Sequence, residues 1–212
     1  MTSDFDPKLL SGFLENSEKR ENSSYVRNKE RLYNWDERYI ELAAHVASWS
    51  KDPDAKVGCV IVSPTFGRAL TFSFNGFPAI VTDCVKLLHH EDKDKKLDRT
   101  IHAEQNALLY AGREAKGCHA YIVGKPVCNT CAIMLIQAGI RRVVAAPPLA
   151  EGGGKWDERG RMALTMFKDA GVGFVPIDDT KNASLIEKYN LRPEKAKKTK
   201  KKTAPTELDA CC

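Results

Sequence analysis

The sequence predicts an α/β protein, a three-layer α/β/α sandwich built on a mixed five-stranded sheet. Short runs rich in β-branched residues alternate along the chain with longer stretches of helical spacing, an order typical of sheets covered by helices. Gly and Pro stand at most boundaries between these segments. The chain has 212 residues, 42% hydrophobic and 29% charged, so one domain of ordinary size can bury a core.

The first half of the domain is expected to hold a helix, a β-hairpin and a long loop. Asp36 is a favourable N-cap residue, and alanines at helical spacing follow it. The next apolar run has the composition of a strand buried on both faces, and a Pro/Gly turn leads from it to a second strand. These elements are a helix from Asp36 to about Ala47, strands over 57–62 and 69–74, and a loop over 75–100 with one helical turn.

The second half alternates helix and strand, with glycines where helices are expected to end. Strands separated by helices indicate a predominantly parallel sheet, in which only the first pair of strands forms a hairpin. The expected elements are helix 102–111, strand 120–123, helix 128–138, strand 141–146, a helix that begins after Gly154, and strand 173–175.

Composition divides the chain into three parts. Residues 1–34 are polar without a sustained period and are expected to form a mobile arm, while residues 35–180 form the domain. Residues 181–212 carry nine basic and four acidic residues and are expected to be a disordered basic tail. The rest of the chain carries 24 residues of each sign, so the net charge of +5 lies in the tail and the domain is neutral.

The sequence is expected to contain neither a secretory signal nor a membrane span. The N-terminus lacks a basic stretch followed by an apolar one, and no apolar run is long enough to cross a membrane. We therefore expect a cytoplasmic protein, with nuclear import or nucleic-acid binding as alternative roles for the lysines of the tail.

Two short clusters carry the chemistry: His102-Ala103-Glu104 and Cys128-x-x-Cys131, each at the start of an expected helix. Cysteines three apart on a helix lie on nearly the same face, so both sulfurs reach one ion, and His102 supplies a third ligand. Three protein ligands leave one position open, as in catalytic zinc sites. Glu104 can then move protons to and from water. Alone, the cysteine pair also fits a redox pair or half of a structural zinc site; the two clusters together favour catalytic Zn²⁺.

The two clusters resemble the signature of zinc-dependent nucleobase deaminases. Further stretches make the chain similar to the cytidine and deoxycytidylate deaminase family, deoxycytidylate branch, over residues 35–177. These stretches are Trp35-Asp36-Glu37-Arg38-Tyr39, Ser48-Trp49-Ser50-Lys51-Asp52-Pro53, Lys56-Val57-Gly58, Asn75-Gly76-Phe77-Pro78, His102-Ala103-Glu104-Gln105-Asn106-Ala107 and Ala138-Gly139-Ile140.

The resemblance implies a cytidine deaminase-like fold and the hydrolysis of dCMP to dUMP with release of ammonia, a supply of dUMP for dTMP synthesis. It implies Zn²⁺ on His102, Cys128 and Cys131, hydroxide attack at C4 of the ring, and Glu104 as the residue that protonates N3 and then the leaving amine. It further implies a homo-oligomer and dCTP as an activator.

The resemblance also implies two contacts to the rest of the substrate, from Asn75 to the sugar and from the Ala103 backbone N–H to the base carbonyl. Phosphate recognition needs a cation, for which Lys56, Arg99 and Lys125 are candidates near the expected pocket rim, although each also fits a solvated surface charge. Trp156 fits two interpretations equally, an aromatic cover for the base and a packing residue of its helix.

Two other functions stay open. A deaminase acting on a base in single-stranded DNA or tRNA would use the basic tail as a guide. A protein that binds polynucleotides usually needs a basic groove on its folded domain, and this domain is neutral. A non-catalytic, zinc-stabilised regulator or nucleic-acid-binding protein would have no use for Glu104.

The remaining cysteines and histidines have a simpler interpretation. Cys84, His89 and His90 match the spacing of a second zinc site without a fourth ligand, and we favour solvated histidines. Cys59 and Cys118 are expected to be inert core thiols, and Cys211 and Cys212 plain terminal thiols.

Overall fold

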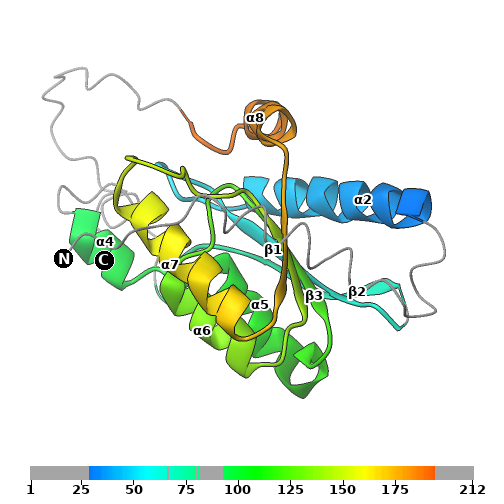
Figure 1. Ribbon diagram of the computed structural model, residues 1–212. Coiled ribbons are helices and arrows are strands. Elements are labelled where there is room, and N and C mark those ends of the chain that lie inside the picture. The colour runs from blue at the N-terminus through cyan, green and yellow to red at the C-terminus, as the bar shows by residue number, and fades with distance from the viewer. Residues whose placement is uncertain (1–28, 66, 80, 82–92, 194–212) are drawn as a thin grey trace, which may run out of the picture.

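A mixed five-stranded sheet forms the centre of the protein. The computed structural model describes residues 29–65, 67–79, 81 and 93–193. Its strands are β1 (Gly58–Ser63), β2 (Arg68–Phe74), β3 (His119–Val123), β4 (Arg142–Ala145) and β5 (Gly173–Pro176), in the spatial order β2-β1-β3-β4-β5 (Figure 1). The mixed sheet of the predicted fold class is confirmed, and the strands lie where the sequence predicts them to within two residues.

Four of the five strands run in the same direction, as predicted, but β1 has two antiparallel neighbours where only its hairpin partner was expected. β1 is antiparallel to β2 and also to β3, whereas β3, β4 and β5 are parallel to one another. The hairpin reverses the chain, and the crossover from β2 then places β3 parallel to β2 on the far side of β1. As a result, β2 and β3 end at the edge of the sheet where β1 begins, and Gly58 pairs with both Phe74 and Val123.

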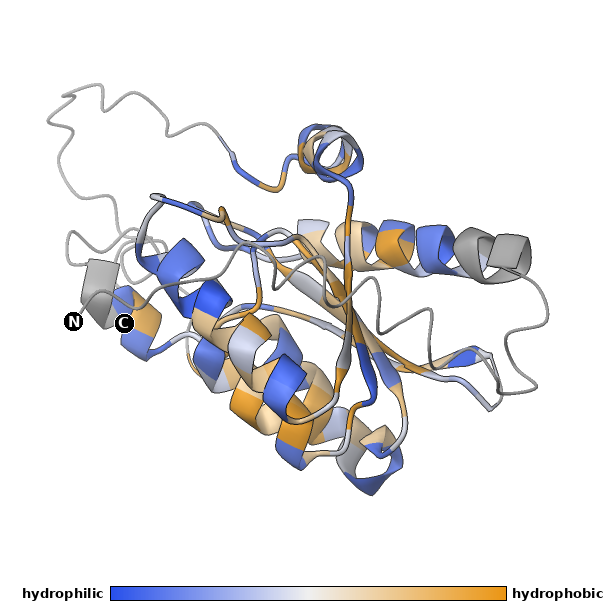
Figure 2. Cartoon of the chain, in the orientation of Figure 1, coloured by the Kyte–Doolittle hydropathy of each residue, from blue (hydrophilic) through white to orange (hydrophobic). Residues whose placement is uncertain are grey.

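Helices cover both faces of the sheet, which confirms the three layers. One face carries α5 (Ala103–Ala111), α6 (Asn129–Gln137) and α7 (Lys155–Asp169), and the other carries α2 (Lys29–Ser48) and α8 (Asp179–Lys188). Alternate strand residues enter the two cores: Cys59 and Ile61 pack with α5 to α7, and Val60 and Val62 pack with α2. Figure 2 shows hydrophobic residues along the central strands and on the helices beside them.

The first helix begins earlier than the sequence predicts, and Asp36 is not its N-cap. α2 starts at Lys29, so the predicted boundary between residues 34 and 35 falls inside it. The Asp36 carboxylate instead accepts hydrogen bonds from the Tyr121 hydroxyl at 2.6 Å and from the guanidinium of Arg142 at 2.8 Å. These partners follow Asp36 by 85 and 106 residues, so no local pattern indicates them.

The predicted start of the basic tail at residue 181 also differs from the structure. Asp178 caps α8 by accepting hydrogen bonds from the backbone N–H groups of Thr180 and Lys181. Leu185 and Leu191 are buried in the core beneath α2, so the folded domain extends to about residue 193. The sequence analysis did not predict this short amphipathic helix because the segment carries an excess of basic residues. The lysines of 195–202 lie outside the described residues.

The long loop over 75–100 contains α4 (Lys93–Asp98), the single helical turn that was expected, and a short bridge between Gly76 and Ile101 ties its ends together. Cys84, His89 and His90 lie outside the described residues. In the part of the chain that the structure describes, no helix is long and apolar enough to span a membrane.

Gly58 allows α2 to approach the sheet closely. A Cβ atom on Gly58 would overlap the carbonyl oxygen of Ala43 and lie 2.7 Å from the backbone nitrogen of Ala47. Both alanines are fully buried, so the helix cannot move away without opening the core.

We expect Gly58→Ala to lower the free energy of unfolding by about 3 kcal/mol or more, because the clash is with backbone atoms. Urea denaturation measures this change. The matched control is Gly173→Ala in β5, where the new Cβ would meet ordinary contacts at 3.6 and 4.0 Å and the change should stay within about 1 kcal/mol. Equal stability of the two variants would contradict the close approach.

Candidate active site

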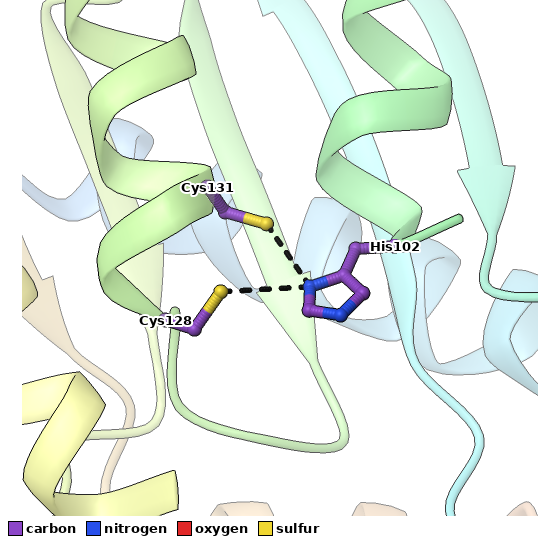
Figure 3. Close-up of side chains that lie close together, drawn as sticks. All are labelled: His102, Cys128 and Cys131. Atoms are coloured by element: carbon purple, nitrogen blue, oxygen red, sulfur yellow. Dashed lines mark hydrogen bonds between the residues drawn. The ribbon is translucent and has the colours of Figure 1, made fainter. Parts of the chain in front are cut away.

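The starts of two helices hold the three predicted metal ligands. His102 is the N-cap of α5, Cys128 is the N-cap of α6, and Cys131 lies in the first turn of α6. The backbone N–H of His102 donates to Oε1 of Gln105 at 3.0 Å, which fixes the residue at the helix end. Figure 3 shows the three side chains pointing toward one another from the two helices.

The three donor atoms lie at distances that suit one zinc ion. Nδ1 of His102 is 3.2 Å from Sγ of Cys131 and 3.5 Å from Sγ of Cys128, and the three donors lie within 4.8 Å of one another. Tetrahedral zinc with usual bond lengths would place its nitrogen and sulfur ligands about 3.6 Å apart. Both cysteines are at most 2% exposed. Among the described residues, only this group has the donors and geometry for a metal.

The local electrostatics favour the thiolate form of one of the three donors, Cys128. A hydrogen bond from Cys131, together with one from His102, lowers the pKa of Cys128 to about 4. The hydrogen bond to Cys128 raises the pKa of His102, and the hydrogen bond with Cys128 and burial raise that of Cys131. Both helices direct the positive ends of their dipoles at this point, which favours thiolate. Metal binding would displace the remaining protons.

Glu104 lies next to the ligands on the first turn of α5 and is only 4% exposed. The pKa of its carboxyl group is raised, because the effect of burial exceeds the lowering by His102 and by a hydrogen bond with Cys131. A buried carboxyl group with opposing influences of this kind is suited to accepting and returning a proton.

A cavity of about 290 Å³ opens over this group. Its walls come from the segment before β1, from Asn75 after β2, from α4 and from the start of α5. Lys125, Pro126, Cys128 and Trp156 complete them. The sheet topology explains why these segments lie together: Val57 precedes β1, while Asn75 and Lys125 follow β2 and β3 at the same edge of the sheet. Ligands of open α/β sheets commonly bind at such an edge.

The structure divides the predicted substrate contacts into two groups. Asn75, Ala103, Trp156 and Lys125 line the cavity, as does Glu104. Lys56 and Arg99 do not line it. The ammonium of Lys56 donates to the carbonyl of Ser48 at 3.2 Å, and Arg99 is exposed. The prediction of these two cations as rim residues therefore receives no support from the cavity.

The Asn75 side chain makes three hydrogen bonds within the protein. Its Oδ1 accepts from the N–H of Val57 at 2.8 Å, and its Nδ2 donates to the carbonyl of Ala55 at 3.0 Å and to Asp52 at 3.5 Å. One lone pair of Oδ1 remains for a substrate hydroxyl. Asn75 is thus first a support of the cavity wall, and its sugar contact stays a prediction.

Trp156 both lines the cavity and packs against the core, and its role as a cover for the base stays a prediction. Its ring centroid is 5.8 Å from that of His102, and it lines the cavity. It also packs against the core beneath α7. The ammonium of Lys125 lies 4.4 Å from the ring centroid, which is a cation–π contact.

Sequence reasoning missed a buried ion cluster in the cavity wall. The ammonium of Lys96, 4% exposed, lies 2.9 Å from Asp52 and 2.8 Å from Asp54. Asp52 also accepts hydrogen bonds from the N–H groups of Asp54 and Ala55. Lys96 sits in a dense charge run, and its partners precede it by more than 40 residues, so only the folded chain reveals the cluster.

Comparison with known proteins agrees with this geometry. The family model of the cytidine and deoxycytidylate deaminase zinc-binding region matches residues 33–147. An uncharacterised deaminase from the luxG 3′ region of Aliivibrio fischeri is 35% identical over 146 residues, covering 68% of this chain and 95% of that protein. The deoxycytidylate deaminase of Mus musculus is 34% identical over 145 residues, covering 66% of this chain and 78% of that protein.

A solved structure is similar in fold. The dCMP deaminase of cyanophage S-TIM5 superposes with a TM-score of 0.52 at 21% identity, over 71% of this chain and 100% of that one. The family match spans more than half of the chain and includes the helix starts that carry His102, Cys128 and Cys131. This chain therefore belongs to the cytidine and deoxycytidylate deaminase family.

Proposed function

We propose that this protein is a zinc-dependent hydrolase that converts dCMP and water into dUMP and ammonia. The observation that carries the proposal is the buried carboxyl group of Glu104 in one cavity with a histidine and a cysteine ligand. The relatives named deoxycytidylate deaminase, at about one-third identity, support dCMP as the substrate.

The residues present fit zinc, which His102, Cys128 and Cys131 would hold. When bound in such a site, zinc supplies Lewis acidity that lowers the pKa of water toward 7. Glu104 is the proton carrier: it accepts a proton from the attacking water and delivers it to N3 of the ring. It then takes the second proton from the new hydroxyl group on C4 and delivers it to the departing amine. Water thus supplies the oxygen of the product, and the amine leaves as ammonia.

The cavity walls orient the base. The backbone N–H of Ala103 would meet the base carbonyl, Trp156 would lie against the ring, and Asn75 would offer its free lone pair to the sugar. These groups sit on helix starts and strand ends that are buried beneath the cavity, so they can hold the ring at a fixed distance from Glu104.

We also propose that the protein works as a homo-oligomer inside the cell. Leu109, Tyr110 and Ile133 are 68%, 74% and 53% exposed on α5 and α6, and such apolar side chains commonly lie in contacts between copies. The four described cysteines form no disulfide, as expected in a reducing compartment.

A substrate panel tests the reaction. We expect ammonia release from dCMP with a kcat/KM at least about tenfold above that for deoxycytidine or cytidine, since specific polar contacts to the phosphate favour the nucleotide. dCTP and a short single-stranded DNA complete the panel. Fastest turnover of the DNA would favour a polynucleotide deaminase, and no turnover of any member would favour a non-catalytic protein.

Glu104→Gln should keep the fold and one zinc per chain while lowering kcat by about 10²–10⁴-fold, because glutamine cannot carry the proton. Metal content by mass spectrometry and ammonia release measure the two effects. The matched control is Glu114→Gln, an exposed glutamate beyond α5, which should retain wild-type turnover. Loss of zinc in Glu104→Gln would instead make this carboxylate part of the metal site.

Cys131→Ser should lower the zinc content from one per chain to nearly zero and lower the Tm, because metal binding and folding are coupled. Cys118→Ser is the control: its thiol donates to the carbonyl of Glu114 away from the cavity, so the zinc content should not change. A Cys131→Ser protein that still binds one zinc ion would remove Cys131 from the ligand set.

A further inference from the structure

The backbone around Trp156 is held by the loop that precedes α7. The Asp157 carboxylate accepts a hydrogen bond from the backbone N–H of Leu149 at 3.0 Å. The guanidinium of Arg161 donates to the carbonyl of Leu149 at 2.8 Å and to that of Gly152 at 3.1 Å. These contacts hold the start of the helix in place. The freedom left to Trp156, in the first turn of α7, therefore lies mainly in its two side-chain torsions.

A glycine on α7 brings Trp156 next to Lys125. A Cβ atom on the buried Gly160 would lie 2.9 Å from the Cβ of Pro148 and 3.2 Å from that of Pro126, so the helix packs directly against both prolines. Trp156 and Gly160 are four residues apart and lie on the same face of the helix. Trp156 therefore lies on the side of α7 that meets Pro126, which Lys125 directly precedes.

The indole ring of Trp156 contacts two cations and the imidazole of His102. The ammonium of Lys125 lies 4.4 Å from the ring centroid, and the guanidinium carbon of Arg159 lies 5.6 Å from it. The centroid of the His102 ring is 5.8 Å away, with the two rings tilted by 53°. Arg159 belongs to the same helix as Trp156, whereas Lys125 follows β3. Lys125 is thus the nearer cation and the one that ties the indole to another segment of the cavity wall.

The Lys125 ammonium has the indole face as its close partner. Lys125 is half-buried, and within the part of the chain that the structure describes it makes no ion pair. Burial lowers the pKa of its ammonium, and Asp52 is the strongest influence that raises it. A cation–π contact is stronger when the cation is withdrawn from water. Rotation of the indole away from Lys125 would remove this compensation for the lost hydration.

Lys125 and Trp156 both line the cavity that contains Glu104. We propose that Lys125 is a positioning residue: its ammonium holds the Trp156 indole in one orientation beside His102, so that the ring forms a fixed wall for the pyrimidine base. This inference rests on the proposed function and adds the residue that sets the orientation of the wall. A ring free to rotate would let the base adopt several orientations before Glu104 and would lower the fraction that can react.

Fluorine NMR of the zinc-loaded protein labelled with 5-fluorotryptophan tests this orientation without substrate or turnover. The chain has three tryptophans, and the signal lost in Trp156→Phe identifies that of Trp156. Lys125→Met keeps an unbranched apolar stem but no charge, so the Trp156 signal should broaden or split as the ring samples several orientations. Lys125→Arg restores a cation and should give one narrow Trp156 signal. The signals of Trp35 and Trp49 should not change.

Turnover of a nucleotide and of its nucleoside separates positioning from direct contact with the substrate. Lys125→Met should lower kcat for dCMP and for deoxycytidine by the same factor of about ten with little change in KM, while Lys125→Arg should retain most of the activity. The matched control is Lys168→Met, an exposed lysine in the last turn of α7, which should behave as the wild type in both measurements.

Three results would overturn the positioning role of Lys125. They are an unchanged Trp156 signal in Lys125→Met, a Lys125→Arg protein as impaired as Lys125→Met, and a loss of turnover confined to dCMP, which would show that Lys125 contacts the phosphate directly. A Trp156 signal that depends on a cation at position 125, in a protein that deaminates neither dCMP nor deoxycytidine, would support the contact and reject the reaction.

Discussion

The active site depends on two helices that begin side by side at one edge of the sheet. β2 and β3 are parallel and flank β1, so the chain leaves both strands at the same edge before it enters α5 and α6. His102 and Cys128 occupy the cap positions of these helices, where the backbone N–H groups carry partial positive charge. Thiolate and carboxylate groups can therefore lie close together there at a lower electrostatic cost. A bound zinc ion would lower that cost further, because its positive charge also stabilises the thiolates.

The opposite wall of the cavity uses a different principle, the satisfaction of buried polar groups. Asp52 links the ammonium of Lys96 to the amide of Asn75, and Asn75 fixes the backbone on both sides of Lys56. Buried charges persist when each finds a partner, and removal of one leaves the other unpaired. The buried polar groups of this wall therefore hold one another in place, with one ammonium shared between two carboxylates.

Local sequence signals predicted most of the elements but not the interactions between distant ones. The hairpin, the three helices of one face and the five strands follow from apolar spacing and from glycines at helix ends. The antiparallel pairing of β1 with β3, the partners of Asp36 and the burial of Leu191 each join residues far apart in the chain. No pattern within a few residues carries information about such contacts. The helix α8 was not predicted because the high charge of the C-terminal segment indicated a disordered tail.

The sequence by itself determined the chemistry: His102, Glu104, Cys128 and Cys131 are recognisable because the spacing of ligands on a helix is a local property. Only the tertiary structure decided which charges line the cavity. Lys56 and Arg99 do not line it, whereas Lys96 lines it paired with Asp52 and Asp54, and Lys125 lines it with its ammonium over the ring of Trp156. The reason is physical: the donors of this metal site stand at fixed local spacings at two helix starts, whereas the availability of a cation depends on every charge that folding places around it.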